Sequence, residues 1–129
     1  MKGNVLRTGL LLFAVSLVVT FTTTALLASG PWQVLGPDGG DARSLAYDPH
    51  NPDRILLGTS TGQMFSSNDG GRTWLRLARL GGDEYVLDHI SIDPENPNHI
   101  YVSAWSAAGQ QIGEIFCTHD GGVNWTTLP

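Results

Sequence analysis

The stretch Ser67-Asn68-Asp69-Gly70-Gly71-Arg72-Thr73-Trp74 has the composition of a tight turn between two β-strands. An aspartate at this place can accept hydrogen bonds from backbone N–H groups of the turn, and the paired glycines can adopt the positive φ that a reversal needs. Trp74 then opens the return strand with a large apolar side chain, which we expect to be buried. The stretch therefore predicts a hairpin whose carboxylate has a structural task.

The same pattern returns in Thr118-His119-Asp120-Gly121-Gly122-Val123-Asn124-Trp125, with corresponding residues 51 positions later. We call residues 67–74 and 118–125 the first and second aspartate turns. A second matching pair, 48–53 and 93–98, holds two prolines in each copy, with corresponding residues 45 positions apart. We call these the proline turns. Spacings in this range indicate repeated structural units, and the difference of six residues predicts an insertion between Trp105 and Gly113.

Short apolar-alternating runs lie between these turns and predict an all-β protein. Four runs per unit is the number expected of a β-propeller blade, with one blade at about residues 42–79 and another at about 86–129. Trp32–Leu35 repeats the Trp-x-x-Leu pattern that follows each aspartate turn, and predicts an orphan strand of another blade. Because two blades cannot close a ring, we expect a fragment of a longer propeller or, if the chain is complete, an oligomer.

The first 30 residues have a different character from the rest. Lys2 and Arg7 precede Leu10–Ala28, a stretch without charged residues. This layout predicts an N-terminal hydrophobic helix that is either a cleaved signal peptide or a membrane anchor over residues 10–28, engaging the membrane or the export machinery. Both alternatives export residues 31–129 to a secreted, periplasmic or cell-surface location.

The charge balance excludes one class of partner. The chain has twelve acidic and seven basic residues, a formal net charge of −5. No cluster of arginines or lysines is present to neutralise phosphates, so the sequence predicts no nucleic-acid partner. Cys117, the single cysteine, falls in a predicted strand and is expected to be a buried thiol.

Ser67-x-Asp69-x-Gly71-x-x-Trp74 resembles the BNR, or aspartate-box, repeat, and Thr118-x-Asp120-x-Gly122-x-x-Trp125 departs from it only in Thr for Ser. The resemblance covers residues 32–129. It implies a β-propeller similar to those of sortilin-type receptors, photosystem II assembly factors, family 74 xyloglucanases and sialidases. The box is a folding element, so the resemblance implies structural roles for its residues and leaves the function open.

The resemblance also allows two enzymatic activities to be tested. Xyloglucanases of this type carry a catalytic aspartate in a first-blade Arg-Thr-Asp-x-Gly-Gly segment, but Ser60 stands at that position here. A hydroxyl cannot replace a carboxylate as general base at neutral pH. The Arg-Ile-Pro segment of sialidases is absent from the sequence. No catalytic residue is therefore assigned.

Tyr101 and Trp105, beside the predicted insertion, are candidates for an aromatic platform that binds a sugar or a peptide; the alternative is that they pack in the interior. A set of acidic residues in predicted connections is a candidate cation or glycan site at one rim, with solvated loops as the alternative. These residues are Asp38, Asp41, Asp83, Glu84 and Asp88. The histidines, His50, His89, His99 and His119, lack metal-ligand spacing, so we expect neither a metal nor a cofactor.

These observations favour an exported, non-catalytic β-propeller module that binds a protein or a glycan. One alternative is a fragment of a secreted glycoside hydrolase, xyloglucanase- or sialidase-like, whose catalytic residues lie in other blades. A second alternative is a protein similar to photosystem II assembly factors.

Overall fold

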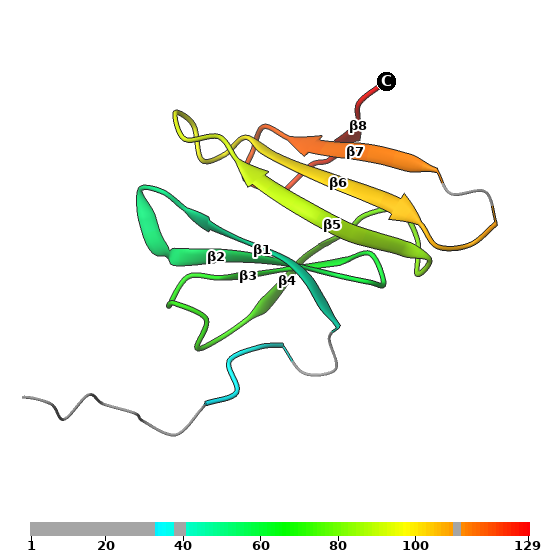
Figure 1. Cartoon of the computed structure of the whole chain (residues 1–129). Helices are drawn as coiled ribbons and strands as arrows, with labels where there is room; N and C mark the ends of the chain where they lie inside the picture. The colour runs from blue at the N-terminus through cyan, green and yellow to red at the C-terminus, as the bar shows by residue number, and fades with distance from the viewer. Residues whose placement is uncertain (1–32, 38–40, 110–111) are drawn as a thin grey trace, which may run out of the picture. The chain divides into compact units, whose positions relative to one another are not determined.

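The structure is a computed structural model that describes residues 33–37, 41–109 and 112–129. The described residues form two four-stranded antiparallel sheets and no helix, which confirms the predicted all-β class (Figure 1). Sheet 1 contains β1 (Ala42–Asp48), β2 (Asn51–Thr59), β3 (Gln63–Ser67) and β4 (Leu75–Arg79). Sheet 2 contains β5 (Tyr85–Ile92), β6 (Ile100–Ser106), β7 (Gly113–Thr118) and β8 (Thr126–Thr127).

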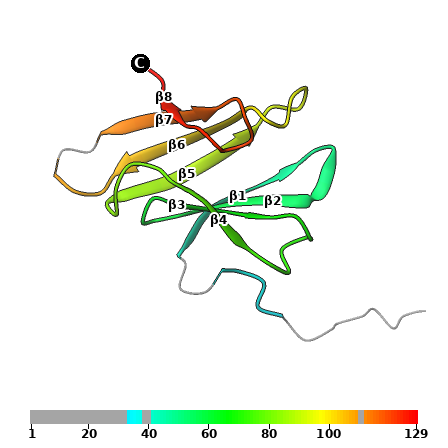
Figure 2. The same cartoon turned by 180° about the vertical axis from the view of Figure 1, so that it is seen from behind.

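Each sheet is a simple meander, in which every strand pairs with its neighbour in sequence (Figure 2). Consecutive antiparallel strands need only short connections, and the Gly-, Pro-, Asp- and Asn-rich stretches supply them. The connection between β6 and β7 is longer than its counterpart between β2 and β3, at the place where the insertion is predicted. Within each sheet the proline turn and the aspartate turn lie at the same end, because they join the first and the last strand pair. We call it the turn end.

The two proline turns differ in length, which corrects one expectation. In sheet 1, β2 already begins at Asn51, which pairs with Asp48, so the predicted turn 48–53 contracts to Pro49 and His50. Pro52 is accommodated in a strand whose first residues lie beyond the ladder that pairs β2 with β3. In sheet 2, β5 ends at Ile92 and β6 starts at Ile100, which leaves the full loop that the sequence predicts.

The main core lies between the sheets, where β5 packs against β1 and β2. Side chains alternate along a strand, so one face of sheet 1 carries Ser44, Ala46, Leu56, Gly58 and Met64. This face meets sheet 2 directly: the Ser44 hydroxyl donates to the Leu87 carbonyl at 2.7 Å. The buried cluster takes residues from both sheets. Its members are Leu56, Met64, Leu80, Leu87, Ile90, Ile100, Val102, Ala104 and Phe116.

Several sequence predictions fall at or beyond the limits of the described residues. The N-terminal hydrophobic segment and Trp32 lie outside them. Residues 33–35 belong to no strand, and Val34 is 99% exposed; the orphan strand is expected to pair within another blade and stays a prediction. β4 and β8 are the outermost strands of their sheets and pair with β3 and β7 on one side. In the described part of the chain, no helix is long and apolar enough to span a membrane.

Candidate functional site

The first aspartate turn is held together by its own side chains. The Ser67 hydroxyl donates to Asp69 Oδ1 at 2.8 Å and accepts the Gly71 N–H at 2.8 Å. Thr73 donates its backbone N–H to Asp69 Oδ1 at 2.8 Å and its hydroxyl to Oδ2 at 2.6 Å. Gly71 has φ of 86°, a conformation that a side chain would oppose. Both carboxylate oxygens of Asp69 are therefore engaged within the turn.

The second aspartate turn repeats this network with different side chains. The Thr118 hydroxyl replaces that of Ser67, donating to Asp120 Oδ1 at 2.7 Å and accepting the Gly122 N–H at 3.1 Å. Asn124 takes the place of Thr73, with its backbone N–H 2.9 Å from Asp120 Oδ1 and its side-chain amide 2.7 Å from Oδ2. The geometry depends on a hydroxyl, a carboxylate and glycines at fixed positions, and tolerates exchange of the remaining residues.

These hydrogen bonds stabilise the ionised form of both aspartates. The Thr73 hydroxyl, the Thr73 backbone N–H and the Ser67 hydroxyl together lower the pKa of Asp69 to about 2. The Asn124 backbone N–H, the Thr118 hydroxyl and the Asn124 amide hold the pKa of Asp120 well below its usual value. A carboxylate with so low a pKa and with occupied oxygens is a poor proton donor or acceptor near neutral pH. The arrangement suits a structural anion.

The tryptophans that follow the turns are less buried than expected. Trp74 and Trp125 are each half-buried, and the indole N–H of each donates back to its own turn, to the Gly71 carbonyl at 2.9 Å and the Gly122 carbonyl at 3.0 Å. The burial expected of Trp74 is therefore only partial, and its ring lies against Gly71 of its own turn. Trp125 still packs against the core cluster.

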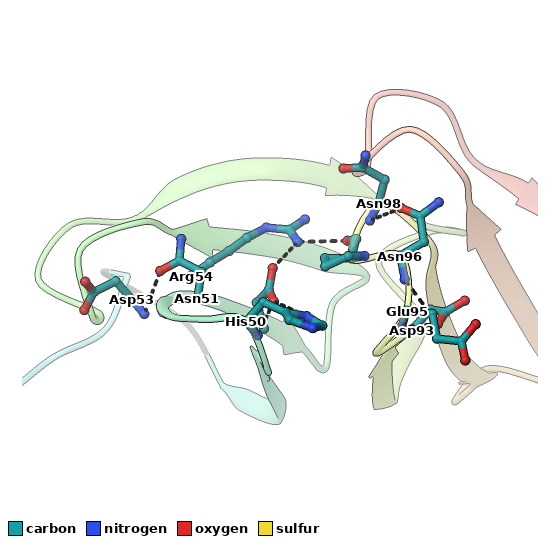
Figure 3. Close-up of polar contacts among 10 residues, drawn as sticks. His50, Asn51, Asp53, Arg54, Asp93, Glu95, Asn96 and Asn98 are labelled. Carbon is teal, nitrogen blue, oxygen red and sulfur yellow. Dashed lines mark hydrogen bonds and ion pairs between the residues drawn. The ribbon is translucent and has the colours of Figure 1, made fainter.

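At the turn end, Arg54 links the two sheets (Figure 3). Its guanidinium donates from one nitrogen to Asp48 Oδ2 at 3.1 Å and to the carbonyl of Pro97, in the second proline turn, at 2.8 Å. Asp48 is only 4% exposed. Burial alone would raise the pKa of Asp48, but the hydrogen bonds from the His50 backbone N–H and from Arg54 outweigh it, so its pKa is lowered. We call Arg54, Asp48 and Pro97 the arginine clasp.

Sheet 2 has a histidine where sheet 1 has Arg54, since residues 54 and 99 are 45 positions apart. His99 Nδ1 lies 3.5 Å from Asp93 Oδ2, and its Nε2 lies 3.1 Å from the Asn96 amide nitrogen. The ring of His119, in the second aspartate turn, contacts His99 edge-on with centroids 4.6 Å apart. Sequence spacing did not suggest this pair; only the alignment of the proline turns places His99 beside an aspartate. Among the described residues no group of three or more potential ligands could hold a metal ion.

Tyr101 and Trp105 share one face of β6, pointing away from sheet 1, because neither belongs to the face that packs in the core. They are four positions apart, which corresponds to about 13 Å along a strand, so only an extended ligand can contact both. Tyr101 lies near the turn end and is 36% exposed. Trp105 is half-buried and lies at the opposite end, next to the connection between β6 and β7.

The acidic candidates are dispersed. Asp41 pairs with Arg43 at 3.9 Å, and Asp83 pairs with Arg79. Glu84 and Asp88 are exposed, and Asp38 lies outside the described residues. Ser60 sits in the β2–β3 turn, where its N–H donates to the Asp41 carbonyl at 3.2 Å. No carboxylate takes the place of the missing catalytic aspartate within this turn.

Two curated fungal proteins are similar to the chain over 98 residues. The probable oligoxyloglucan-reducing end-specific xyloglucanase of Neosartorya fischeri is 28% identical, and the oligoxyloglucan-reducing end-specific xyloglucanase of Emericella nidulans is 26% identical. Each match takes in 74% of this chain and 11% of the relative, so the chain spans a small part of those proteins. No family model matches the sequence.

Solved structures show the same fold. An ancestral GH74 enzyme matches with a TM-score of 0.62 and 24% identity, over 75% of this chain and 14% of that protein. The GH74 enzyme of Niastella koreensis matches with a TM-score of 0.55 and 22% identity, over 70% of this chain and 14% of that protein. YCF48 from Cyanidioschyzon merolae matches with a TM-score of 0.56 and 19% identity, over 76% of this chain and 29% of that protein. These proteins are β-propellers, so the pair of sheets is propeller-like.

Proposed function

We propose that the chain is a non-catalytic part of an exported β-propeller, and that it binds a xyloglucan-type glycan. The hydrogen bonding of Asp69 and Asp120 carries the non-catalytic part, because both carboxylates are committed to their turns. In this proposal the two turns are aspartate boxes that fix the register of each blade. The choice of a glycan is supported by the likeness to xyloglucanases, at identities that leave the substrate open.

The proposed contact for the glycan is Trp105 together with the adjoining β6–β7 connection. An indole ring offers an apolar face on which a sugar ring can stack while its hydroxyl groups remain solvated. The β6–β7 connection is longer than the β2–β3 connection of sheet 1. It therefore distinguishes sheet 2 from sheet 1 at the end opposite the turn end. We exclude Tyr101 from the site because it stands at the position of Leu56, which packs between the sheets.

The test is a calorimetric titration of the full chain with xyloglucan oligosaccharides, paired with an assay for newly formed reducing ends. We expect binding without turnover, and loss of binding in Trp105→Ala. Tyr47→Ala is the matched control, since it removes an aromatic side chain that is 64% exposed on sheet 1. Equal binding by both variants would refute the Trp105 contact, and no binding by the unmodified chain would refute the glycan.

A second candidate is a segment of a secreted glycoside hydrolase whose catalytic carboxylates belong to other blades. It is favoured by the same fungal relatives, of which the chain matches 11%. Release of reducing ends by a longer protein that joins this chain to the other blades, with none released by the chain alone, would decide for this candidate against the first. The likeness to YCF48 supports the fold alone.

Export is proposed from the sequence of the first 30 residues, with Lys2 and Arg7 ahead of an uncharged stretch. Expression in a bacterial host, followed by mass measurement of the exported product, distinguishes a cleaved signal from a retained anchor. Recovery of the unprocessed chain in the cytoplasm alone would contradict export.

A further inference from the structure

The two sheets can be superposed residue by residue, because corresponding positions are 45 apart in the first two strands and 51 apart in the last two. Each face of sheet 1 therefore has a corresponding face in sheet 2. The face of sheet 2 that packs on sheet 1 includes Ile90, Ile100, Val102 and Phe116. Their counterparts in sheet 1 are Leu45, Ile55, Leu57 and Phe65, which lie on the face of sheet 1 directed away from sheet 2. We call it the outer face of sheet 1.

The outer face of sheet 1 therefore has the composition of a buried interface, and its β1 side is exposed although Leu57 on β2 is only 4% exposed. Ile100 and Val102 are 0% exposed and Ile90 is 4% exposed, whereas Leu45 is 62% exposed. Tyr47, the counterpart of Ile92, is 64% exposed. Exposed apolar side chains of this kind along one strand indicate a site of association.

Sheet 2 has an outer face too, and it corresponds to the face of sheet 1 that is covered. Tyr101 and Ile115 occupy the positions of Leu56 and Met64, and Ser103 occupies that of Gly58. Leu56 and Met64 are 0% exposed, but Tyr101 and Ile115 are 36% and 46% exposed. The contact between sheets 1 and 2 is therefore a template: the outer face of sheet 1 corresponds to one side of it, and the outer face of sheet 2 corresponds to the other.

We propose that the outer face of sheet 1 docks on the outer face of sheet 2 of a second copy of this chain. The contact repeats the packing of sheet 2 on sheet 1, so it joins two different surfaces head to tail. A contact of this type closes into a ring when the rotation permits and otherwise adds further copies. The occupant is another copy because the chain carries both halves of the interface.

Steric differences predict that the new contact is wider than the internal one. A Cβ atom at Gly58 would lie 2.8 Å from Leu87 Cβ, so the internal interface needs glycine there. At the proposed contact, Ser103 takes the place of Gly58 and Ala42 that of Leu87. The sheets must separate slightly to admit the Ser103 side chain, and Tyr101, larger than Leu56, fills the space that Ala42 leaves.

A further exposed side chain, Leu128, would also be buried by the docking of a second copy. Leu77 in sheet 1 lies against the backbone of Gly122, where an added Cβ would be 2.8 Å from Leu77 Cδ2. Its counterpart in sheet 2 is Leu128, which is 41% exposed. In the proposed contact Leu128 of one copy covers the first aspartate turn of the next. Leu45, Tyr47, Tyr101, Ile115 and Leu128 all become buried by a single docking operation.

The proposal is tested by disulfide trapping in the full chain, kept in mild detergent so that residues 10–28 do not associate. Ala42→Cys with Ser103→Cys places two thiols at the counterparts of Leu87 and Gly58, and Cβ positions this close permit a disulfide after a small shift. Under mild oxidation we expect a ladder of linked copies that a reductant removes. Cys117 is 2% exposed but pairs with Tyr101 on the same face, so Cys117→Ser is included in the test and control variants.

The matched control is Ala42→Cys with Val123→Cys, because Val123 is 79% exposed in the second aspartate turn, away from the outer face. An equal ladder in the control, or none in the test pair, overturns the proposal. Native mass of the chain without added cysteines gives a second measurement. Tyr47→Asp is expected to reduce the mass to that of one copy, whereas Leu75→Asp, at an exposed position of β4, leaves it unchanged. A monomeric unmodified chain also overturns the proposal, and would mean that another segment covers this face.

Discussion

Sheet 1 and sheet 2 are two versions of one unit, and their differences follow from what covers each. Leu56, Gly58 and Arg54 in sheet 1 have Tyr101, Ser103 and His99 as counterparts in sheet 2. The three residues of sheet 1 all face sheet 2 directly, through core packing, close backbone approach and the arginine clasp. Their counterparts look outward. A position in this repeat is therefore constrained by the neighbouring sheet as well as by its own strand.

The largest expected difference concerns the core. Leu56→Ala removes a side chain that is 0% exposed, and we expect a loss of about 2–5 kcal/mol in unfolding free energy. Tyr101→Ala, the truncation at the counterpart, is expected to lose less than half as much when both are measured in a Tyr47→Asp background that keeps the copies apart, because Tyr101 is then 36% exposed. Urea denaturation followed by circular dichroism measures both. Equal losses would mean that the outer face of sheet 2 is covered as fully as the face of sheet 1.

The arginine clasp gives the next effect. Arg54→Met keeps most of the apolar stem and removes the charged hydrogen bonds to Asp48 and Pro97, with an expected loss of about 1.5–3 kcal/mol. Much of the loss comes from leaving Asp48, 4% exposed, without its cation. His99→Met is the control and should have a smaller effect, since Asp93 is partly exposed and keeps the Glu95 N–H at 2.8 Å. The same urea titration compares them, and a larger loss at His99 would contradict this account of the clasp.

Gly58 tests the close approach of the sheets. Gly58→Ala places a methyl group 2.8 Å from Leu87 Cβ and 2.5 Å from the Ser44 hydroxyl, so overpacking is expected to lower stability by about 1–3 kcal/mol. Ser103→Ala, at the counterpart, adds no atoms and should change stability little. A stabilised Gly58→Ala variant in thermal unfolding would show that the sheets have room to separate.

The smallest effect is the pH dependence that the aspartate turns share. Because folding lowers the pKa of Asp69 from 3.8 to about 2, its contribution to stability is complete above pH 4 and is lost as the pH falls toward 2. Asp120 contributes with the same sign, since its pKa is also lowered. Asp69→Asn should flatten the acid limb of a plot of urea midpoint against pH, whereas Asp88→Asn, at an exposed position, should leave it unchanged. An unaltered acid limb in Asp69→Asn would remove the turn from this role.

Strand pairing was predictable because each strand pairs with its neighbour in sequence. The turns near Asp48, Asp69, Asp93 and Asp120 therefore determine the order of each sheet locally. The half-buried tryptophans, the reach of Arg54 to Pro97 and the contact of His99 with His119 were not predictable from local patterns. They depend on how one sheet packs on another, and on rings folding back over their own turns.

The outermost strand of each sheet affects how readily the protein aggregates. Within the described residues the far edges of β4 and β8 pair with no further strand, and such edges can recruit other chains into fibrils. β4 bears Arg76 and Arg79, and β8 has only two residues, both threonines. The arginines of β4 and the short length of β8 both make it less favourable for strands of other chains to pair with these edges. The protein can thus expose apolar faces for specific docking while its hydrogen-bonding edges discourage aggregation.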